Sequence, residues 1–71
     1  MTVTDSYKTE IQALTKSISE EAEAVRRYRE RARTAKSLTS RRLWLHVLAE
    51  EKAHEREFRN RLAEVKRLAA R

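Results

Sequence analysis

The sequence contains no cysteine, no proline and no glycine among its 71 residues. Without cysteine the chain can form no disulfide scaffold, no thiolate metal site and no cysteine nucleophile. Without glycine it has no glycine-rich loop to hold a phosphate group. Because tight turns between strands need such residues, their absence also disfavours a strand-rich fold.

Charged and helix-forming residues are abundant instead. Seventeen Lys and Arg against eleven Asp and Glu give a formal net charge of +6, and 39% of the residues are charged. Ala, Arg, Glu, Lys and Leu, which are strong helix formers, dominate the composition. A positive balance attracts anions, including nucleic acids and membrane surfaces, but does not by itself name a partner.

The sequence predicts neither a secretory signal nor a membrane-spanning segment. Its first fifteen residues lack an apolar core flanked by basic residues. The longest uncharged stretch, residues 43–49, is too short to cross a bilayer. We therefore expect a cytoplasmic protein without a membrane partner.

The residue pattern predicts an all-α fold in a single domain, residues 1–71. Helical patterns extend from about residue 5 to 36 and from about 38 to 70. The polar, uncharged run at 37–40 separates them, and so short a connection predicts an antiparallel hairpin.

Side chains that can cap a helix stand where each helix is expected to begin. Thr4 or Asp5 can cap the first helix, and Ser37 or Thr39 the second. In each case a side-chain oxygen would accept a hydrogen bond from a free backbone amide of the first turn.

Apolar residues repeat along both helices in steps of three and four, the heptad pattern of packed helices. The stripe on the first helix consists of Tyr7, Ile11, Leu14, Ile18, Glu21, Val25, Tyr28, Ala32 and Ala35. The stripe on the second consists of Trp44, Val47, Glu51, His54, Phe58, Leu62, Val65 and Ala69, widened by Leu45 and Leu48. Two helices alone form a groove rather than an enclosed core, so we expect a homodimer that completes a four-helix bundle.

Three ionisable residues, Glu21, Glu51 and His54, interrupt these apolar stripes. In an antiparallel hairpin that turns near residue 37, facing residue numbers sum to roughly 74, so the three side chains meet in one layer. Glu51 and His54 are three residues apart and can reach one metal ion from one helix face. A two-fold axis would supply four carboxylates and two imidazoles, which suit two iron or manganese ions.

Each of these residues also has an interpretation without a metal. Glu21 alone could fix the register of the helices, His54 could be a hydrogen-bonded histidine of the core or its boundary, and Glu51 could pair with an arginine. Tyr28 could be a core residue, a hydrogen-bonding neighbour of a ligating carboxylate, or a redox-active neighbour of the metals. The common level and the Glu-x-x-His spacing together favour the metal site.

Other polar residues lie off the stripes. Glu20 and Glu23 could be solvated carboxylates or could attract Fe(II) on its way to the centre, and His46 could pack at the core boundary or bind an outer metal ion. The arginines of both helices could form ion pairs along each helix or a nucleic-acid surface. Nucleic acid is the less favoured partner because no aromatic residues are interleaved with those arginines on an exposed face.

Residues 19–28 and 50–54 resemble the encapsulated ferritin family, the two-helix, half-size relatives of ferritin. The family core reads Glu-Glu-x-Glu-Ala-Val-x-Trp-Tyr and then Glu-Glu-Lys-x-His, with the same separation between the two motifs as in this chain. The resemblance implies that Glu21, Glu51 and His54 are the ligands of a di-iron ferroxidase centre shared by two subunits. Arg27 stands where the family has tryptophan.

The resemblance also implies roles for the neighbouring residues and for the whole protein. Tyr28 matches the family's tyrosine near the metals, Glu20 and Glu23 its carboxylates at the metal entrance, and His46 a histidine of an outer site. The implied activity is oxidation of Fe(II) by dioxygen for iron storage and detoxification. The implied partners are a ring of dimers, commonly a decamer, and an encapsulin shell, although residues 65–71 contain no glycine- and proline-containing docking tail.

Two other functions remain open from the sequence. A basic helical-hairpin dimer could bind RNA or another anionic partner without enzymatic activity, and a coiled-coil module could be purely structural. Manganese or zinc could substitute for iron, because the same ligands bind both.

Overall fold

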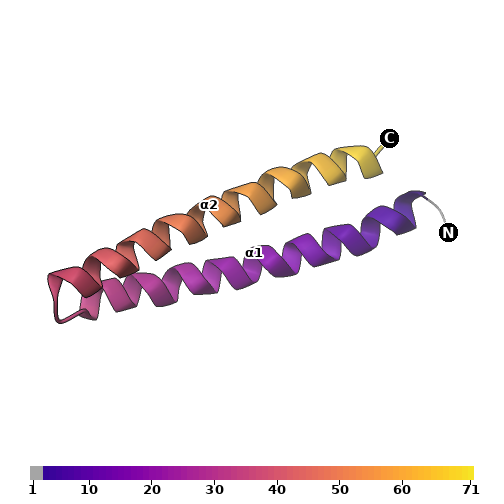
Figure 1. The fold of residues 1–71 in the computed structure, drawn as a ribbon. Coiled ribbons are helices and arrows are strands. Elements are labelled where there is room, and N and C mark those ends of the chain that lie inside the picture. Colours follow the sequence, from indigo (N-terminus) through magenta and orange to yellow (C-terminus); the bar gives the residue numbers. More distant parts are fainter. Residues whose placement is uncertain (1–2) are drawn as a thin grey trace.

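The protein is an antiparallel hairpin of two long α-helices. The computed structural model describes residues 3–71, with side chains described from Ser6 onward. Helix α1 comprises Val3–Thr34 and helix α2 comprises Leu38–Ala69, and the start of α1 and the end of α2 lie at the same end of the hairpin, far from the turn (Figure 1). The described residues contain no strand, so the predicted all-α hairpin is confirmed.

The turn between the helices is set by the cap of α2. Ser37 has an extended backbone, with φ −124° and ψ 155°, and its hydroxyl oxygen accepts a hydrogen bond from the Ser40 amide at 3.1 Å. Of the two predicted caps, Ser37 is therefore the correct one. Because Ser37 must leave the helical conformation, α1 ends at Thr34, two residues before the predicted end.

At the other end of the chain, α1 begins at Val3, two residues before the predicted start. The cap predicted for Thr4 or Asp5 lies outside the described side chains. Helix α2 ends at Ala69, one residue before its predicted end near 70.

Loss of the cap is expected to destabilise the hairpin. Replacing Ser37 with alanine removes the hydroxyl that accepts from the Ser40 amide, which should cost about 1 kcal/mol and lower the thermal midpoint measured by circular dichroism. Thr39→Ala removes a hydroxyl that is already inside the helix and serves as the control. Equal midpoints for the two variants would contradict the assigned cap.

The predicted stripes face each other between the helices. In α1 the central stripe residues Ile18, Val25 and Ala32 are buried, and the other stripe residues are half-buried. In α2 the buried side chains are Leu48 and Val65, the latter completely. The heptad pattern thus identified the packed face of each helix.

Ala24 and Leu45 depart from the predicted stripes. Ala24 is buried although it lies beside the stripe. Leu45, predicted to widen the apolar stripe, is 49% exposed. Leu45 lies roughly 60° around the helix from the buried Leu48, beyond the sector that a single neighbouring helix covers.

A cross-helix ion pair joins the ends of the hairpin opposite the turn. Arg61 in α2 contacts Glu10 in α1 at 3.1 Å and Glu64 in its own helix at 3.0 Å. Glu10 and Arg61 are a pair whose numbers sum close to the expected value, so this contact agrees with the predicted register.

The hairpin is a rod with little enclosed interior. Its Cα atoms extend 54 × 14 × 11 Å, and the radius of gyration is 16.3 Å, whereas a compact chain of this length has about 11 Å. The accessible surface is 5589 Å², against roughly 4,600 Å² for a compact protein of this mass. Neither helix, over the described residues, has an apolar stretch that could span a lipid bilayer.

Candidate metal centre

Glu21, Glu51 and His54 come together near the middle of the rod. Each offers one ligand atom, and these atoms lie within 4.8 Å of one another. Two ligands on opposite sides of one first-row metal ion are about 4 Å apart, so the three atoms need only small movements to share an ion. The layer predicted from the register is therefore present in the structure.

Helix geometry places the three side chains in this layer. Glu51 and His54 are one turn apart on the same face of α2. Glu21 reaches them from α1 because contacts on both sides of the layer hold the register of the hairpin. On the side of the chain ends, this contact is the ion pair between Glu10 and Arg61. On the turn side, Tyr28 stacks on Trp44, with ring centroids 5.7 Å apart and an angle of 21° between the planes.

Of the three side chains, the Glu21 carboxylate has the least favourable surroundings. Its Oε2 atom is buried and has no hydrogen-bond partner. The pKa of Glu21 is raised above its ordinary value of 4.5, first because a protonated Glu21 can hydrogen-bond to the Glu51 side chain. Desolvation and the negative charge of Glu51 raise this pKa further, while the charge of His54 lowers it. A cation would satisfy the lone oxygen and relieve the repulsion between the two carboxylates, so the residues fit a metal ion.

The interpretations of Glu51 and His54 without a metal find little support in the geometry. Among side chains 6–71, no Lys or Arg forms an ion pair with Glu21 or Glu51. His54 is exposed, which corrects the expectation that it lies in the buried stripe. One neighbouring helix cannot cover this side of α2, so the group opens to the surface of the single hairpin.

Removing the Glu21 charge is expected to stabilise the metal-free hairpin. Because folding raises the pKa of Glu21, the charged carboxylate destabilises the folded state above that pKa, and this penalty disappears as the pH falls towards 4.5. Glu21→Gln should therefore raise the thermal midpoint by a few degrees at pH 7 in a chelator, and the gain should shrink as the pH approaches 4.5.

The control for this measurement is Glu20→Gln, which removes the same charge at an exposed neighbouring position. A loss of stability in Glu21→Gln at pH 7, or an equal gain in both variants, would contradict the repulsion between Glu21 and Glu51.

Tyr28 packs as a core-type aromatic residue. Besides the stacked Trp44 ring, the Arg31 guanidinium lies 5.3 Å from the Tyr28 centroid and 5.1 Å from the Trp44 centroid. This cluster was not predicted from the sequence, although Tyr28 follows Glu21 by seven residues and Trp44 precedes Glu51 by seven. The equal spacing of Tyr28 and Trp44 from the ionisable residues of facing stripes was the signal that could have predicted their contact. A role of Tyr28 beside the metals stays a prediction.

The remaining predicted residues lie on the surface around the centre. Glu20 and Glu23 are exposed. His46 is also exposed, which rules out packing at the core boundary, and its Nε2 lies 2.8 Å from the Glu50 carboxylate. Glu50 was missed as a partner, although its spacing of four residues from His46 is the signal for such a contact.

An acidic belt surrounds the middle of the rod. Residues 18–25 and 46–57 hold seven of the eleven Asp and Glu but two of the seventeen Lys and Arg. Because the rest of the chain is strongly basic, this belt is where a cation is attracted most.

Comparisons of the chain with models of known protein families, with curated proteins and with solved structures found no match. The chemistry of the centre therefore has to be inferred from its own residues. Two carboxylates and one imidazole form a mixed oxygen and nitrogen donor set, which is typical of iron, manganese or zinc rather than of calcium or magnesium.

Proposed function

We propose that the protein is a ferroxidase, which oxidises Fe(II) to Fe(III) with dioxygen at a di-iron centre formed between two copies of the chain. The observation that carries this proposal is the group of Glu21, Glu51 and His54, with ligand atoms within 4.8 Å and one buried carboxylate oxygen without a partner. Iron enters this proposal as the substrate that the centre binds.

A second copy of the chain is needed to complete such a centre. One hairpin supplies two carboxylates and one imidazole, and a two-fold axis doubles this set. The hairpin exposes roughly 1,000 Å² more surface than a compact protein of its mass, while a standard interface buries about 800 Å² on each partner. The excess surface of the hairpin is therefore of the size that each partner buries in a stable homodimer.

The position of the group suggests how the two rods pair. Glu21 lies near the middle of α1, and Glu51 and His54 near the middle of α2. A two-fold axis perpendicular to the rods would superimpose both layers with full overlap of the helices. It would also separate the two turn ends, where residues 26–45 of each copy hold eight of the seventeen basic residues.

Each residue has a defined part in the proposed reaction. Glu21, Glu51 and His54 would hold the ions, the two glutamates through carboxylate oxygens and His54 through a ring nitrogen. Two carboxylates favour the higher charge of Fe(III), so they promote loss of an electron. Two Fe(II) ions together give two electrons to dioxygen, which takes up two protons and leaves as hydrogen peroxide.

The surface residues would control access to the centre. Glu20 and Glu23 attract Fe(II) from solution towards the layer. Arg27, four residues after Glu23, competes for that carboxylate and would weaken the attraction. Tyr28 lies two turns from Glu21, where it can support a ligating carboxylate through a hydrogen bond, and His46 with Glu50 would bind an ion outside the centre.

The resemblance of residues 19–28 and 50–54 to encapsulated ferritins supports the same activity and suggests its purpose. On this basis we propose iron storage and detoxification as the role, a ring of dimers such as a decamer as the assembly, and an encapsulin shell in the cytoplasm as the place of storage.

Anaerobic titration with Fe(II), followed by air, tests the proposal. We expect binding to saturate near one iron per chain, and air to produce a near-ultraviolet ferric signal much faster than in buffer alone. Trp44 is the single tryptophan and lies about 10 Å from the layer, so its fluorescence should be quenched by the metal before air is admitted.

Oxidation no faster than in buffer, without saturable binding, would refute the ferroxidase. Retention of RNA that depends on salt and needs no metal would support the alternative of a basic hairpin dimer that binds RNA.

A further inference from the structure

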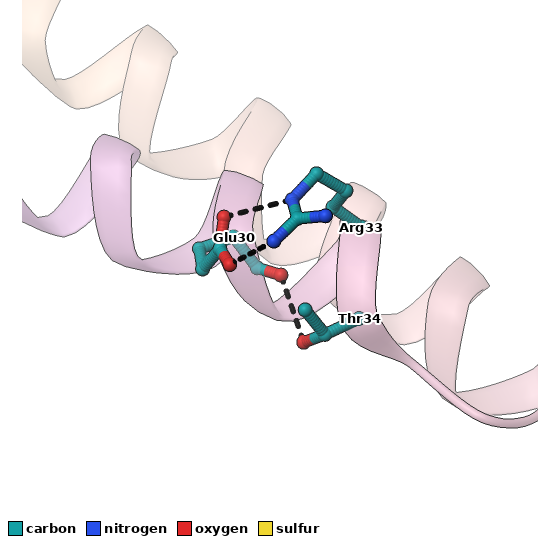
Figure 2. A network of polar contacts seen from close by, with 3 residues as sticks. All are labelled: Glu30, Arg33 and Thr34. Atoms are coloured by element: carbon teal, nitrogen blue, oxygen red, sulfur yellow. Dashed lines mark hydrogen bonds and ion pairs between the residues drawn. The ribbon is translucent and has the colours of Figure 1, made fainter.

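The turn end of the hairpin holds an unbalanced positive charge. Residues 26–45 contain eight of the seventeen Lys and Arg and one carboxylate, Glu30. Figure 2 shows that this carboxylate is already engaged: Arg33 Nε donates to Glu30 Oε2 at 3.0 Å, and a second nitrogen of Arg33 contacts Oε1. Thr34 donates to the Glu30 carbonyl at 3.0 Å. The other basic side chains at this end therefore find no carboxylate within residues 26–45.

The three large apolar side chains with the highest exposure lie at the same end. Leu38 is 62% exposed, Leu43 53% and Leu45 49%. At about 100° per residue, Leu43 lies on the same side of α2 as His54, whereas Leu45 lies roughly 180° away from His54. Leu38 is two turns before Leu45. The partner proposed for the metal centre would thus approach Leu43 but leave Leu38 and Leu45 uncovered.

Basic residues surround these two leucines on the far side of α2. These residues lie within a sector of roughly 100° around the axis of α2 and extend about 27 Å along it. Between residues 38 and 56, all side chains in this sector are exposed and none is acidic. We name this surface the leucine–arginine stripe, and it consists of Leu38, Arg41, Arg42, Leu45, Ala49, Lys52 and Arg56.

We propose that the leucine–arginine stripe binds to the surface of an anionic lipid bilayer. The guanidinium groups of Arg41 and Arg42 would contact headgroup phosphates, and Leu38 and Leu45 would enter the boundary between headgroups and acyl chains. The proposal is independent of the di-iron centre, because the stripe lies away from it. It is an alternative to the encapsulin shell as the location of the protein, because a chain bound to a bilayer lies outside such a shell. It concerns a surface contact, whereas the expectation of no membrane partner came from the lack of a spanning segment.

Two other occupants fit the stripe less well. Nucleic acid fits less well because all four aromatic residues are half-buried, so the described chain offers no exposed ring for base stacking. The leucines of the stripe would also stay in water in such a complex. Against a second copy of the chain, two identical stripes packed face to face would bring like charges together. A bilayer surface provides both the negative charge and the apolar layer beneath it.

Flotation of the full chain with vesicles tests the proposal. We expect binding to vesicles made from equal parts of phosphatidylglycerol and phosphatidylcholine, and none to vesicles of phosphatidylcholine alone. Leu45→Ser should lower the partition coefficient about tenfold, because it removes one inserted leucine. Leu43→Ser, at a position of similar exposure on the other side of α2, should leave binding nearly unchanged.

A second pair of variants tests the charge. Arg41→Glu with Arg42→Glu should abolish binding, while Lys66→Glu with Arg67→Glu, which changes the net charge equally at the other end of α2, should retain most of it. Circular dichroism checks that each variant is helical. No binding of the wild type, equal binding by Leu45→Ser, or binding of a DNA duplex in place of vesicles would overturn the proposal.

Discussion

Replacing His54 or Glu51 with alanine is expected to abolish rapid Fe(II) oxidation. Even substitutions of residues that only support a metal ligand reduce affinity or activity by about 10- to 100-fold, so loss of a ligand should lower the rate by roughly 100-fold or more. In the proposed dimer the effect would be larger, because one substitution would remove a ligand from both halves of the centre. The measurement is the initial rate of the ferric signal after air is admitted.

Glu57→Ala is the matched control for Glu51→Ala. It removes an exposed glutamate from the same helix, six residues further along, where the structure brings no partner ligand close. We expect its rate to equal that of the wild type. If His54→Ala or Glu51→Ala also oxidised Fe(II) at the wild-type rate, that residue would be removed from the proposed site.

The second large effect is expected in the assembly state. If each copy contributes half of the ligands, as proposed, a metal ion that binds the centre also holds two hairpins together. Addition of Fe(II) without oxygen, or of Zn(II) as a stable substitute, should convert monomers to dimers in sedimentation velocity, and a chelator should reverse the change. Glu21, with its buried and unpartnered oxygen, should contribute most to the repulsion that metal binding relieves.

His54→Ala separates association at the metal from association through apolar contacts. This variant should lose the metal-dependent increase in size, while Glu20→Gln, at an exposed neighbouring position, should retain it. A wild-type chain that remains monomeric with and without metal would contradict a centre shared between two copies. A purely structural coiled coil would instead gain stability from His54→Leu and show no response to metal.

Much of the fold follows from local sequence patterns. The three-and-four spacing of apolar residues identified the packed faces that hold Ile18 and Val65, since a helix repeats every 3.6 residues wherever it forms. The run at 37–40 located the turn, because a hydroxyl side chain at that point can replace the missing partner of a free amide. These two facts also determine the register.

The register in turn made the candidate centre predictable. Given a hairpin that turns near Ser37, Glu21 must lie opposite the level of Glu51 and His54, and their ligand atoms do approach within 4.8 Å. The spacing of Glu51 and His54 in one helix needs no tertiary information. Pairing with a second chain, and the activity, stay predictions that the experiments above address.

The sequence by itself thus determined which residues are helical, where the chain turns and that Glu21, Glu51 and His54 share a layer, because these depend on periodicity along one chain. The tertiary structure alone decided how much of each side chain is covered. It exposed His54, Leu45 and His46, and it left Glu21 Oε2 buried without a partner. The physical reason is that burial depends on the sector that the neighbouring helix covers, and the spacing of residues in one helix does not specify that sector.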